Sequence, residues 1–416
     1  MFEESNEAPA APAPEPKEGG STGRRRRPRR RRSRRHGGNV GTPMPFEGYL
    51  WRRDDGKAFL LGPSSKFHLT GEDPVLDGAL LSRWHLESGL RLTASVQPPN
   101  GHQRPTVLDI SNIEGLQPDV YRQQAVPFSE LTSIDPTERF HLETQPETLE
   151  PRVIELMAPI GKGQRCLIVA PPKAGKTKLL QQLAHAIGVN HPEVQIFVLL
   201  VDERPEEVTD WRRSVIRGDV YASSSDESMQ SHIEVSEMVL ERARRLVELG
   251  QDVVVFMDSL TRMSRAYNNA QKSSGRILSG GVDARTMEKP RRFFGSARNI
   301  ENGGSVTIVA TCLVDTGSRM DEVIFQEFKG TGNMEIVLTR DLFERRIFPC
   351  MNIPQSGTRK EEKLYSREEV ERIYLLRRAL AALPPHDAMQ ALLSKLKQFH
   401  SNAEFLANIQ AQPNGR

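Results

Sequence analysis

Hydrophobic positions divide the chain into regions of different periodicity. Between residues 46 and 120, apolar and polar residues alternate over short segments that end at glycine or proline. This pattern predicts a small antiparallel barrel of about five strands. From residue 151 to about 358, near-continuous apolar runs alternate with stretches of 3.6-residue spacing. Such a pattern is typical of an α/β fold, in which helices cover both faces of a parallel sheet.

The predicted strands can be placed individually. In the α/β region they cover residues 166–170, 196–201, 253–258, 305–314 and 335–340, and one barrel strand is expected within residues 73–84. Residues 121–150 are rich in proline and glutamate, which indicates a connector, and the chain reads as helical from residue 366 onward. The predicted organisation is a tail (1–45), a barrel (46–120), a connector (121–150) and an α/β domain with a helical C-terminal part (151–416).

Composition excludes several classes of protein. The longest apolar runs, Ile196–Val201 and Val253–Met257, are far shorter than the ~20 residues that span a membrane. No N-terminal stretch resembles a signal peptide, so a cytoplasmic protein is expected. The three cysteines lie far apart, without the spacing of a disulfide framework or a zinc site.

The positive charge is concentrated in the tail. Residues 1–40 carry a net charge of +6, including ten arginines between Arg24 and Arg35, whereas the rest of the chain carries −3. With almost nothing apolar to bury, the tail is expected to be disordered. Its arginines predict binding to a polyanion such as RNA, and a merely solubilising tail is the alternative.

A phosphate-binding loop is predicted at residues 170–177, APPKAGKT, between a strand and a helix. In such a loop, backbone N–H groups hold phosphates, Lys176 reaches the β- and γ-phosphates, and Thr177 binds Mg²⁺. The first position is Ala170 where the strict motif has glycine. An ordinary helix cap is the alternative.

Two further strands end in carboxylates. Asp258 ends the run VVVFMD and is placed to hold Mg²⁺ through water, although many such residues only cap a helix. Glu203 follows the run 196–201, where a base that activates water must lie in a parallel sheet. A surface salt-bridge cluster is the alternative for Glu203.

Together, a series of segments resembles bacterial transcription termination factor Rho. In order along the chain they are APPKAGKT, VLLVDERPEEVTD, DSLTR, RAYN, LSGGVDA, RRFFGSARN, DTGSRMDEVIFQEFKGTGN and SGTRKEE. The resemblance extends from about residue 46 to about residue 411. It implies a RecA-like P-loop ATPase core preceded by an OB-fold, cold-shock-like barrel.

The resemblance also implies an activity and its partners. Members of this family form ring-shaped homohexamers that hydrolyse ATP with Mg²⁺ and pull single-stranded RNA through the ring in the 5′–3′ direction. They terminate transcription by releasing the nascent transcript, so the RNA polymerase elongation complex enters as a candidate partner.

Site residues follow from the resemblance. Glu203 would activate water, Asp258 would serve the metal, Phe348 would stack on adenine, and Arg359 would reach the γ-phosphate of a neighbouring subunit as an arginine finger, with Arg346 nearby. The other residues implied to contact ATP are Gly161, Lys162, Gly163, Gln164, Arg165, Cys166, Lys173, Ala174, Gly175, Lys176, Thr177, Lys178 and Arg204.

RNA is expected to contact two loops and the barrel. The implied residues are Arg276, Gly280 and Gly281 in one loop, Arg319 in the other, and Phe59 in the barrel. For each of the two loops, the alternative is a flexible surface loop that does not bind RNA.

The barrel departs from the family pattern. Lys57, Val75 and Arg104-Pro105 stand where the family carries aromatic residues that stack on bases. Because each stacked base contributes about 1–3 kcal/mol, we hypothesise that the arginine tail has taken over part of RNA capture.

Two other classes of function stay open at this stage. One is a different ring ATPase, such as a rotary or export ATPase subunit that does not depend on RNA. The other is an RNA-binding protein with an inactive ATP site. The barrel and tail disfavour the first, and the presence of Lys176, Glu203, Asp258 and Arg359 disfavours the second.

Overall fold

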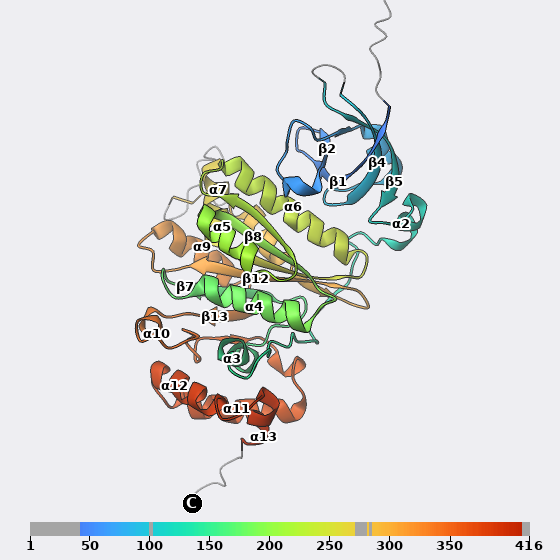
Figure 1. Cartoon of the computed structure of the whole chain (residues 1–416). Helices are drawn as coiled ribbons and strands as arrows, with labels where there is room; N and C mark the ends of the chain where they lie inside the picture. Colours follow the sequence, from blue (N-terminus) through green and yellow to red (C-terminus); the bar gives the residue numbers. More distant parts are fainter. Residues whose placement is uncertain (1–41, 100–102, 271–280, 283–284, 410–416) are drawn as a thin grey trace, which may run out of the picture. The chain divides into compact units, whose positions relative to one another are not determined.

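The computed structural model describes residues 42–99, 103–270, 281–282 and 285–409 (Figure 1). Most of the predicted tail lies outside these residues, as do Arg276 and Gly280 of the first predicted RNA loop.

The described N-terminal residues form the predicted barrel, which is closed, with strand order β1-β2-β3-β5-β4. Its elements, with the helix that follows it, are β1 (Met44–Arg52), β2 (Ala58–Leu61), η1 (Pro63–Ser65), β3 (Val75–Leu76), α1 (Gly78–Trp84), β4 (Arg91–Gln97), β5 (Thr106–Ile113) and α2 (Pro118–Gln124). The strand expected within residues 73–84 is present as β3, but it covers only two of these residues. Asp77 ends that strand early, since its side chain accepts a hydrogen bond from Ala79 N and caps α1.

The second sheet has nine strands in the described chain, with the order β14-β13-β7-β12-β10-β8-β9 along its main path. The six strands from β13 to β9 are parallel, and β14 pairs antiparallel at one edge. The strands are β6 (Ser133–Ile134), β7 (Arg165–Ala170), β8 (Gln195–Glu203), β9 (Asp219–Ser224), β10 (Asp252–Asp258), β11 (Arg298–Ile300), β12 (Ser305–Leu313), β13 (Met334–Val337) and β14 (Gly357–Thr358).

Alternate residues of each central strand pack on opposite faces of this sheet. In β8, Val198 and Leu200 pack in one core, and Phe197, Leu199 and Val201 pack in the other. Helices α3 (Leu149–Met157), α4 (Lys176–Asn190) and α5 (Pro205–Ser214) supply the first core. Helices α6 (Met229–Val247), α7 (Leu260–Ala270), α8 (Glu288–Gly295) and α9 (Arg319–Lys329) supply the second. The continuous apolar runs therefore reflect a sheet covered on both faces.

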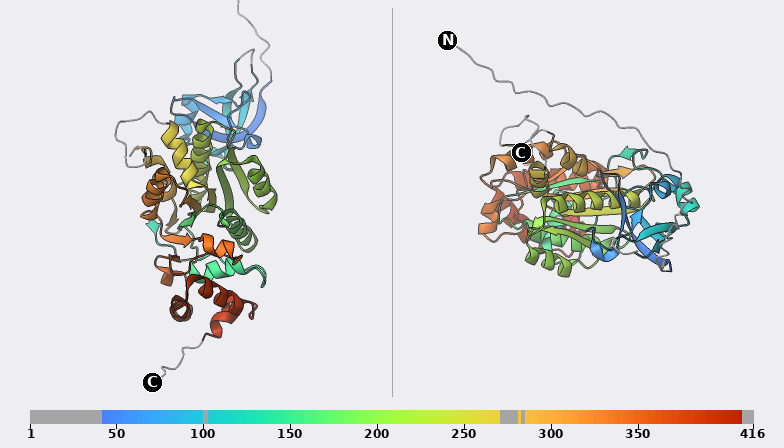
Figure 2. Two further views of the ribbon diagram at one scale, coloured as in Figure 1. Left: turned by 90° about the vertical axis from the view of Figure 1, so that its left-hand side faces the viewer. Right: turned by 90° about the horizontal axis from the view of Figure 1, so that it is seen from above.

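The remaining helices follow the sheet in sequence. They are α10 (Arg340–Glu344), η2 (Glu361–Lys363), α11 (Arg367–Ala381), α12 (Pro385–Leu396) and α13 (Asn402–Ala407). Helices α11 to α13 contact one another, and α11 and α12 also contact α3; these helices lie close together in Figure 1 and in the left view of Figure 2. The sequence reading missed β9, whose apolar run is short.

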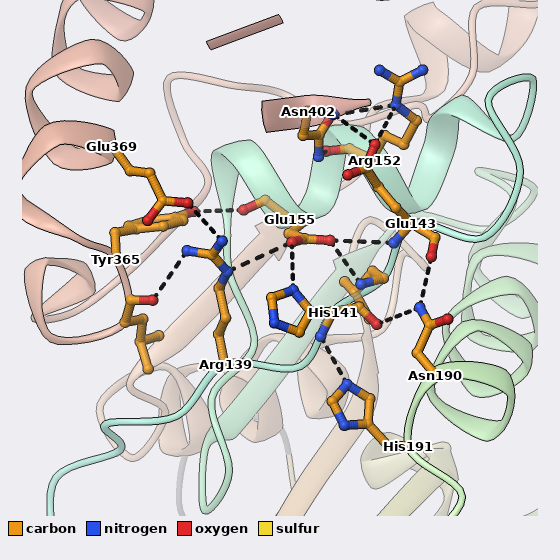
Figure 3. A network of polar contacts seen from close by, with 12 residues as sticks. Arg139, His141, Glu143, Arg152, Glu155, Asn190, His191, Tyr365, Glu369 and Asn402 are labelled. Atoms are coloured by element: carbon orange, nitrogen blue, oxygen red, sulfur yellow. Dashed lines mark hydrogen bonds and ion pairs between the residues drawn. The ribbon is translucent and has the colours of Figure 1, made fainter. Parts of the chain in front are cut away.

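The segment predicted as a connector is tied to the core by a buried carboxylate, Glu155 of α3. Glu155 accepts hydrogen bonds from Leu142 N at 2.7 Å and Glu143 N at 3.2 Å (Figure 3). Arg139 lies beside it and donates to Glu369 of α11 at 2.6 Å. These contacts join the connector, α3 and the C-terminal helices.

The barrel packs on the core through aromatic and charged side chains. The rings of Phe67 and Tyr221 stack with centroids 4.4 Å apart. Lys66 pairs with Asp219 at 2.7 Å, so the loop after η1 contacts β9 of the core sheet.

Candidate functional site

The predicted phosphate-binding loop connects β7 to α4. Gly175, at the N-cap of α4, has φ = +80°, a left-handed conformation that glycine adopts without the steric penalty of a Cβ atom. The turn ends β7 at Ala170 and starts α4 at Lys176. Free N–H groups at the N-terminus of α4 therefore face this loop, and such groups bind phosphate.

The carboxylate of Asp258 lies next to this loop. Lys176 Nζ is 2.7 Å and 2.6 Å from its two oxygens, and Thr177 Oγ1 is 3.3 Å from Oδ2. Asp258 is 1% exposed, and Thr311 of β12 donates to its Oδ1 at 2.7 Å. The structure thus brings together three of the predicted residues, and Thr311, which the sequence did not reveal, orients one of them.

Glu203 lies on the same side of the site, at the carboxyl end of β8. It is 2% exposed, and Lys176 Nζ lies 3.7 Å from its Oε1. Burial and the nearby charge of Asp258 raise the pKa of Glu203 to about 8, against the opposing effect of Lys176 and Arg262. Once ionised, a carboxylate with such a pKa is basic enough to take a proton from an attacking water.

Arg262 of α7 holds this carboxylate in place. Its Nε is 3.0 Å from Glu203 Oε1, and its Nη1 donates to Asp202 Oδ2 at 3.1 Å. The sequence offered one signal for Arg262, its position four residues after Asp258 in the segment DSLTR, but assigned it no role.

A cavity of about 250 Å³ lies beside the P-loop. Phe348 is 38% exposed in its wall, and its ring meets that of Phe343 edge-on with centroids 5.9 Å apart. The lining residues are Glu150, Ala174, Gly175, Lys178, Leu179, Gln182, Leu338, Phe343, Phe348, Pro349 and Cys350. An apolar cavity next to a phosphate loop, with an exposed aromatic ring, has the shape and chemistry to hold a nucleotide base.

The segment from Gly161 to Cys166 lies at the other end of β7. Lys162 forms ion pairs there with Glu138 at 2.6 Å and Asp252 at 2.9 Å. At about 3.3 Å per strand residue, the start of β7 is about 17 Å from its end. Gly161, Gly163, Gln164 and Arg165 therefore cannot surround a nucleotide held by the P-loop of the same chain.

Arg359 is also at that far end. Its backbone N donates to Asn333 O, and the Asn333 side chain accepts from Arg165 N at the start of β7. Arg359 is exposed and lines a cavity of about 360 Å³ with Asn333, Thr358 and Arg377. Arg346 is not in this wall, because its guanidinium lies 5.5 Å over the Phe343 ring beside the base cavity. Within this chain Arg346 and Arg359 therefore lie at different places, and whether Arg346 comes near the Arg359 of a neighbouring copy stays a prediction.

The other nucleotide-site residues surround the P-loop. Lys173 (φ = +63°) and Lys178 are exposed, Ala174 is buried, and Arg204 is exposed at the N-cap of α5, directly after Glu203.

The second predicted RNA loop leads from β12 into α9. Arg319 begins α9 and is exposed, and Gly281 of the first loop is exposed as well. Behind Arg319, Asp321 is 1% exposed and pairs with Arg265 of α7. The loop is therefore tied to the helix that follows Asp258.

Phe59 in the barrel is not available as an open stacking surface. It is 5% exposed, and the guanidinium of Arg104 lies 5.2 Å over its ring. Its cross-strand partner is Val75.

The oxygen atoms beside the P-loop fit a magnesium ion that accompanies ATP. In the described residues, no group of three or more His, Cys, Asp or Glu side chains could hold a metal alone. Mg²⁺ with ATP takes most of its ligands from phosphates and water and one or two from the protein. The hydroxyl of Thr177 and the carboxylate of Asp258 supply ligands of this kind.

Comparison with known proteins agrees with this geometry. Residues 151–358 match the family model of the ATP synthase alpha/beta family, nucleotide-binding domain. The fold resembles an ATPase from the type III secretion system of pathogenic bacteria, with a TM-score of 0.57 and 19% identity over 67% of this chain and 86% of that one. It also resembles the ATP synthase subunit NeqB, with a TM-score of 0.56 and 16% identity over 67% of this chain and 76% of that one. No helix among the described residues has the length and apolarity to cross a membrane.

Sequence relatives are much closer. The chain is 48% identical to transcription termination factor Rho of Cereibacter sphaeroides, over 87% of this chain and 86% of that protein. It is 48% identical to the Aquifex aeolicus protein of the same name, over 88% and 84%. It is 50% identical to the Micrococcus luteus protein of that name, over 86% of this chain but only 52% of that longer protein.

A P-loop next to buried Asp258 and Glu203, on a parallel sheet that matches an ATPase nucleotide-binding domain, defines an ATP-hydrolysing enzyme. The relatives at 48% identity over most of the chain disfavour a rotary or export ATPase subunit. The chain belongs to the transcription termination factor Rho family.

Proposed function

We propose that this chain is an RNA-dependent ATPase that moves along nascent RNA in the 5′–3′ direction and terminates transcription by releasing the transcript. One observation carries the proposal. Lys176, Glu203 and Asp258 gather at one end of the sheet, while Arg359 lies exposed at the other.

This separation calls for a second chain. The ends of β7 are about 17 Å apart, and the arginine side chain cannot cover that distance. A complete site therefore needs Arg359 from a neighbouring copy, which supports a closed homohexamer. Gly161–Cys166 lie on the Arg359 side as well, but only Arg165 among them is partly exposed, so it alone is open to the neighbour's nucleotide.

Within the site, each side chain has a distinct task. Lys176 contacts the β- and γ-phosphates, and Glu203 accepts the proton of the attacking water. Thr177 and Asp258 would hold Mg²⁺, which neutralises phosphate charge when bound. Arg359 of the neighbour stabilises charge in the transition state.

The same contacts link ATP to RNA. Thr311 holds Asp258 and lies on β12, which leads directly into the loop before Arg319. A shift of Asp258 during hydrolysis is therefore transmitted to an exposed arginine beside the proposed RNA path. Gly281, exposed at the described end of the other predicted RNA loop, would lie on the other side of that path.

Part of the initial RNA capture is assigned to the arginine tail. The single remaining family aromatic, Phe59, is buried beneath Arg104, so base stacking on the barrel is reduced. Ten arginines compensate by contacting phosphates. Nascent RNA as the substrate places the protein in the cytoplasm, near the RNA polymerase elongation complex.

The deciding experiment measures ATP turnover with and without single-stranded RNA, together with the mass of the assembly. We expect hexamers whose turnover rises at least 10-fold on addition of RNA. Turnover by single chains, or turnover indifferent to RNA, would contradict the proposal. Lys176→Ala serves as the inactive control, because it removes the phosphate contact and leaves the sheet intact.

A further inference from the structure

The cavity beside the P-loop contains one carboxylate, that of Glu150. Most of its wall is apolar, and the other polar side chains in it are Lys178 and Gln182. Glu150 is partly exposed, and in the described part of the chain its carboxylate forms no hydrogen bond or ion pair with another residue. The cavity therefore presents an acceptor that a ligand can use.

The position of Glu150 is fixed by its helix. Two residues further along α3, Arg152 is fully buried and donates to Pro146 O at 2.9 Å and to Phe399 O at 3.1 Å. Asn402 of α13 donates to Arg152 O at 3.0 Å, and Glu155 anchors the same helix to the connector (Figure 3). The first turn of α3 is thus held at both sides, which keeps the backbone of Glu150 in place at the cavity wall and limits the ordering that binding requires to the side chain itself.

We infer that the carboxylate of Glu150 accepts a hydrogen bond from the exocyclic amino group of adenine and so sets the base preference of this ATPase. A flat purine ring between Phe348 and the P-loop side of the cavity has its amino edge free to meet a wall group. The inference rests on the proposed nucleotide site, because it places the base in this cavity.

A purely structural role for Glu150 makes a different prediction. An acidic residue in the first turn of a helix interacts favourably with the helix dipole, and Lys178 in the same wall could offset its charge. If that were its whole role, replacing it would change the binding of all nucleotides alike.

Two nucleotides that differ only at the amino group separate these roles. The dissociation constants of ATP and of purine riboside 5′-triphosphate, which lacks the amino group, are measured by displacement of a fluorescent ATP analogue from the full chain. GTP is a poorer comparison, because its N1–H can also donate to a carboxylate. We expect the unaltered protein to prefer ATP about 10-fold, the size of one charge-assisted hydrogen bond at a partly exposed site.

Variants of Glu150 then test whether its side chain causes the preference for ATP over purine riboside 5′-triphosphate. Glu150→Ala should bring the ratio of the two constants to about 1, and Glu150→Gln, which keeps an acceptor oxygen, should retain part of the preference. Glu147→Ala, which removes an exposed carboxylate outside the cavity, should leave the ratio unchanged.

Two results would overturn the inference. They are equal affinity for both nucleotides in the unaltered protein, and an unchanged ratio of the two affinities in Glu150→Ala, whether or not both affinities fall together. In each of these cases ATP still binds, so the proposed site stands. If neither nucleotide binds the unaltered protein, the proposed nucleotide site fails and the inference fails with it.

Discussion

Arg262 contacts Glu203 through its Nε atom, 3.0 Å from Oε1, and the same guanidinium bonds Asp202. The two acids follow one another at the end of β8, so one cation on α7 restrains both. Its charge also opposes the upward shift that burial imposes on the pKa of Glu203.

A pH dependence follows from this pair. Glu203 must be ionised to act as a base, so kcat/KM for ATP should rise with pH as this group, with a pKa of about 8, loses its proton. Arg262→Ala removes a positive charge that lowers the pKa of Glu203, so the rising limb should move to higher pH by about 1–3 units. RNA-stimulated turnover measured across pH gives both profiles.

The charge of Arg262 can be separated from its shape. Arg262→Lys keeps a cation near Glu203 and should leave the limb close to its original pH. If kcat/KM rose over the same pH range in the unaltered protein, Arg262→Ala and Arg262→Lys, a group other than Glu203 would control the pH dependence.

Mixed rings test whether Arg359 acts on a neighbour. Glu203→Gln and Arg359→Ala should each lower turnover at least ~100-fold while ATP still binds. When the two variants are mixed equally, about a quarter of the interfaces combine an intact base with an intact arginine, and turnover should partly return.

The matched control uses two defects on the same side of the interface. A mixture of Glu203→Gln and Lys176→Ala chains offers no complete site and should stay inactive. Failure of the first mixture to recover, although mixed rings form, would show that Arg359 does not complete a neighbour's site.

The tail hypothesis is tested by salt dependence. Deletion of residues 1–40 should weaken RNA binding and make it less sensitive to salt, since each phosphate contact adds about −0.7 to the slope of log K against log salt. Fluorescence anisotropy with labelled single-stranded RNA measures the slope.

A charge-matched variant completes the tail experiment. Replacing the ten arginines with lysines should preserve most of the slope, because counterion release depends on charge rather than on guanidinium geometry. If the deletion changed neither slope nor affinity, the tail would have no part in RNA capture.

Phe59 should matter for stability more than for RNA. Its ring is buried beneath Arg104, so Phe59→Ala should lower the free energy of unfolding by about 3 kcal/mol. Leu108→Ala, at a position that is 48% exposed in the same barrel, should change it by less than about 0.5 kcal/mol. Chemical denaturation measures both. A stable Phe59→Ala protein with much weaker RNA binding would instead restore Phe59 as a stacking residue.

Patterns local in sequence predicted much of the fold. The apolar runs of β7, β8, β10 and β12 are strands, because a buried parallel strand needs apolar residues on both faces. The helix predicted after the P-loop is α4. The failures were also local: Asp77 caps a helix where a strand was expected, and the short β9 gave too weak a pattern.

The sequence by itself determined the chemistry of this protein: the phosphate loop, the two strand-end acids and the family resemblance are all written in contiguous residues. Tertiary structure decided which of these residues meet. It placed Gly161–Cys166 and Arg359 at the opposite end of β7 from Lys176, separated Arg346 from Arg359, and brought Arg262, Thr311 and Glu150 to the site. The physical reason is that a motif specifies only its own backbone, whereas contacts between motifs depend on strand order and on which end of each strand a residue occupies.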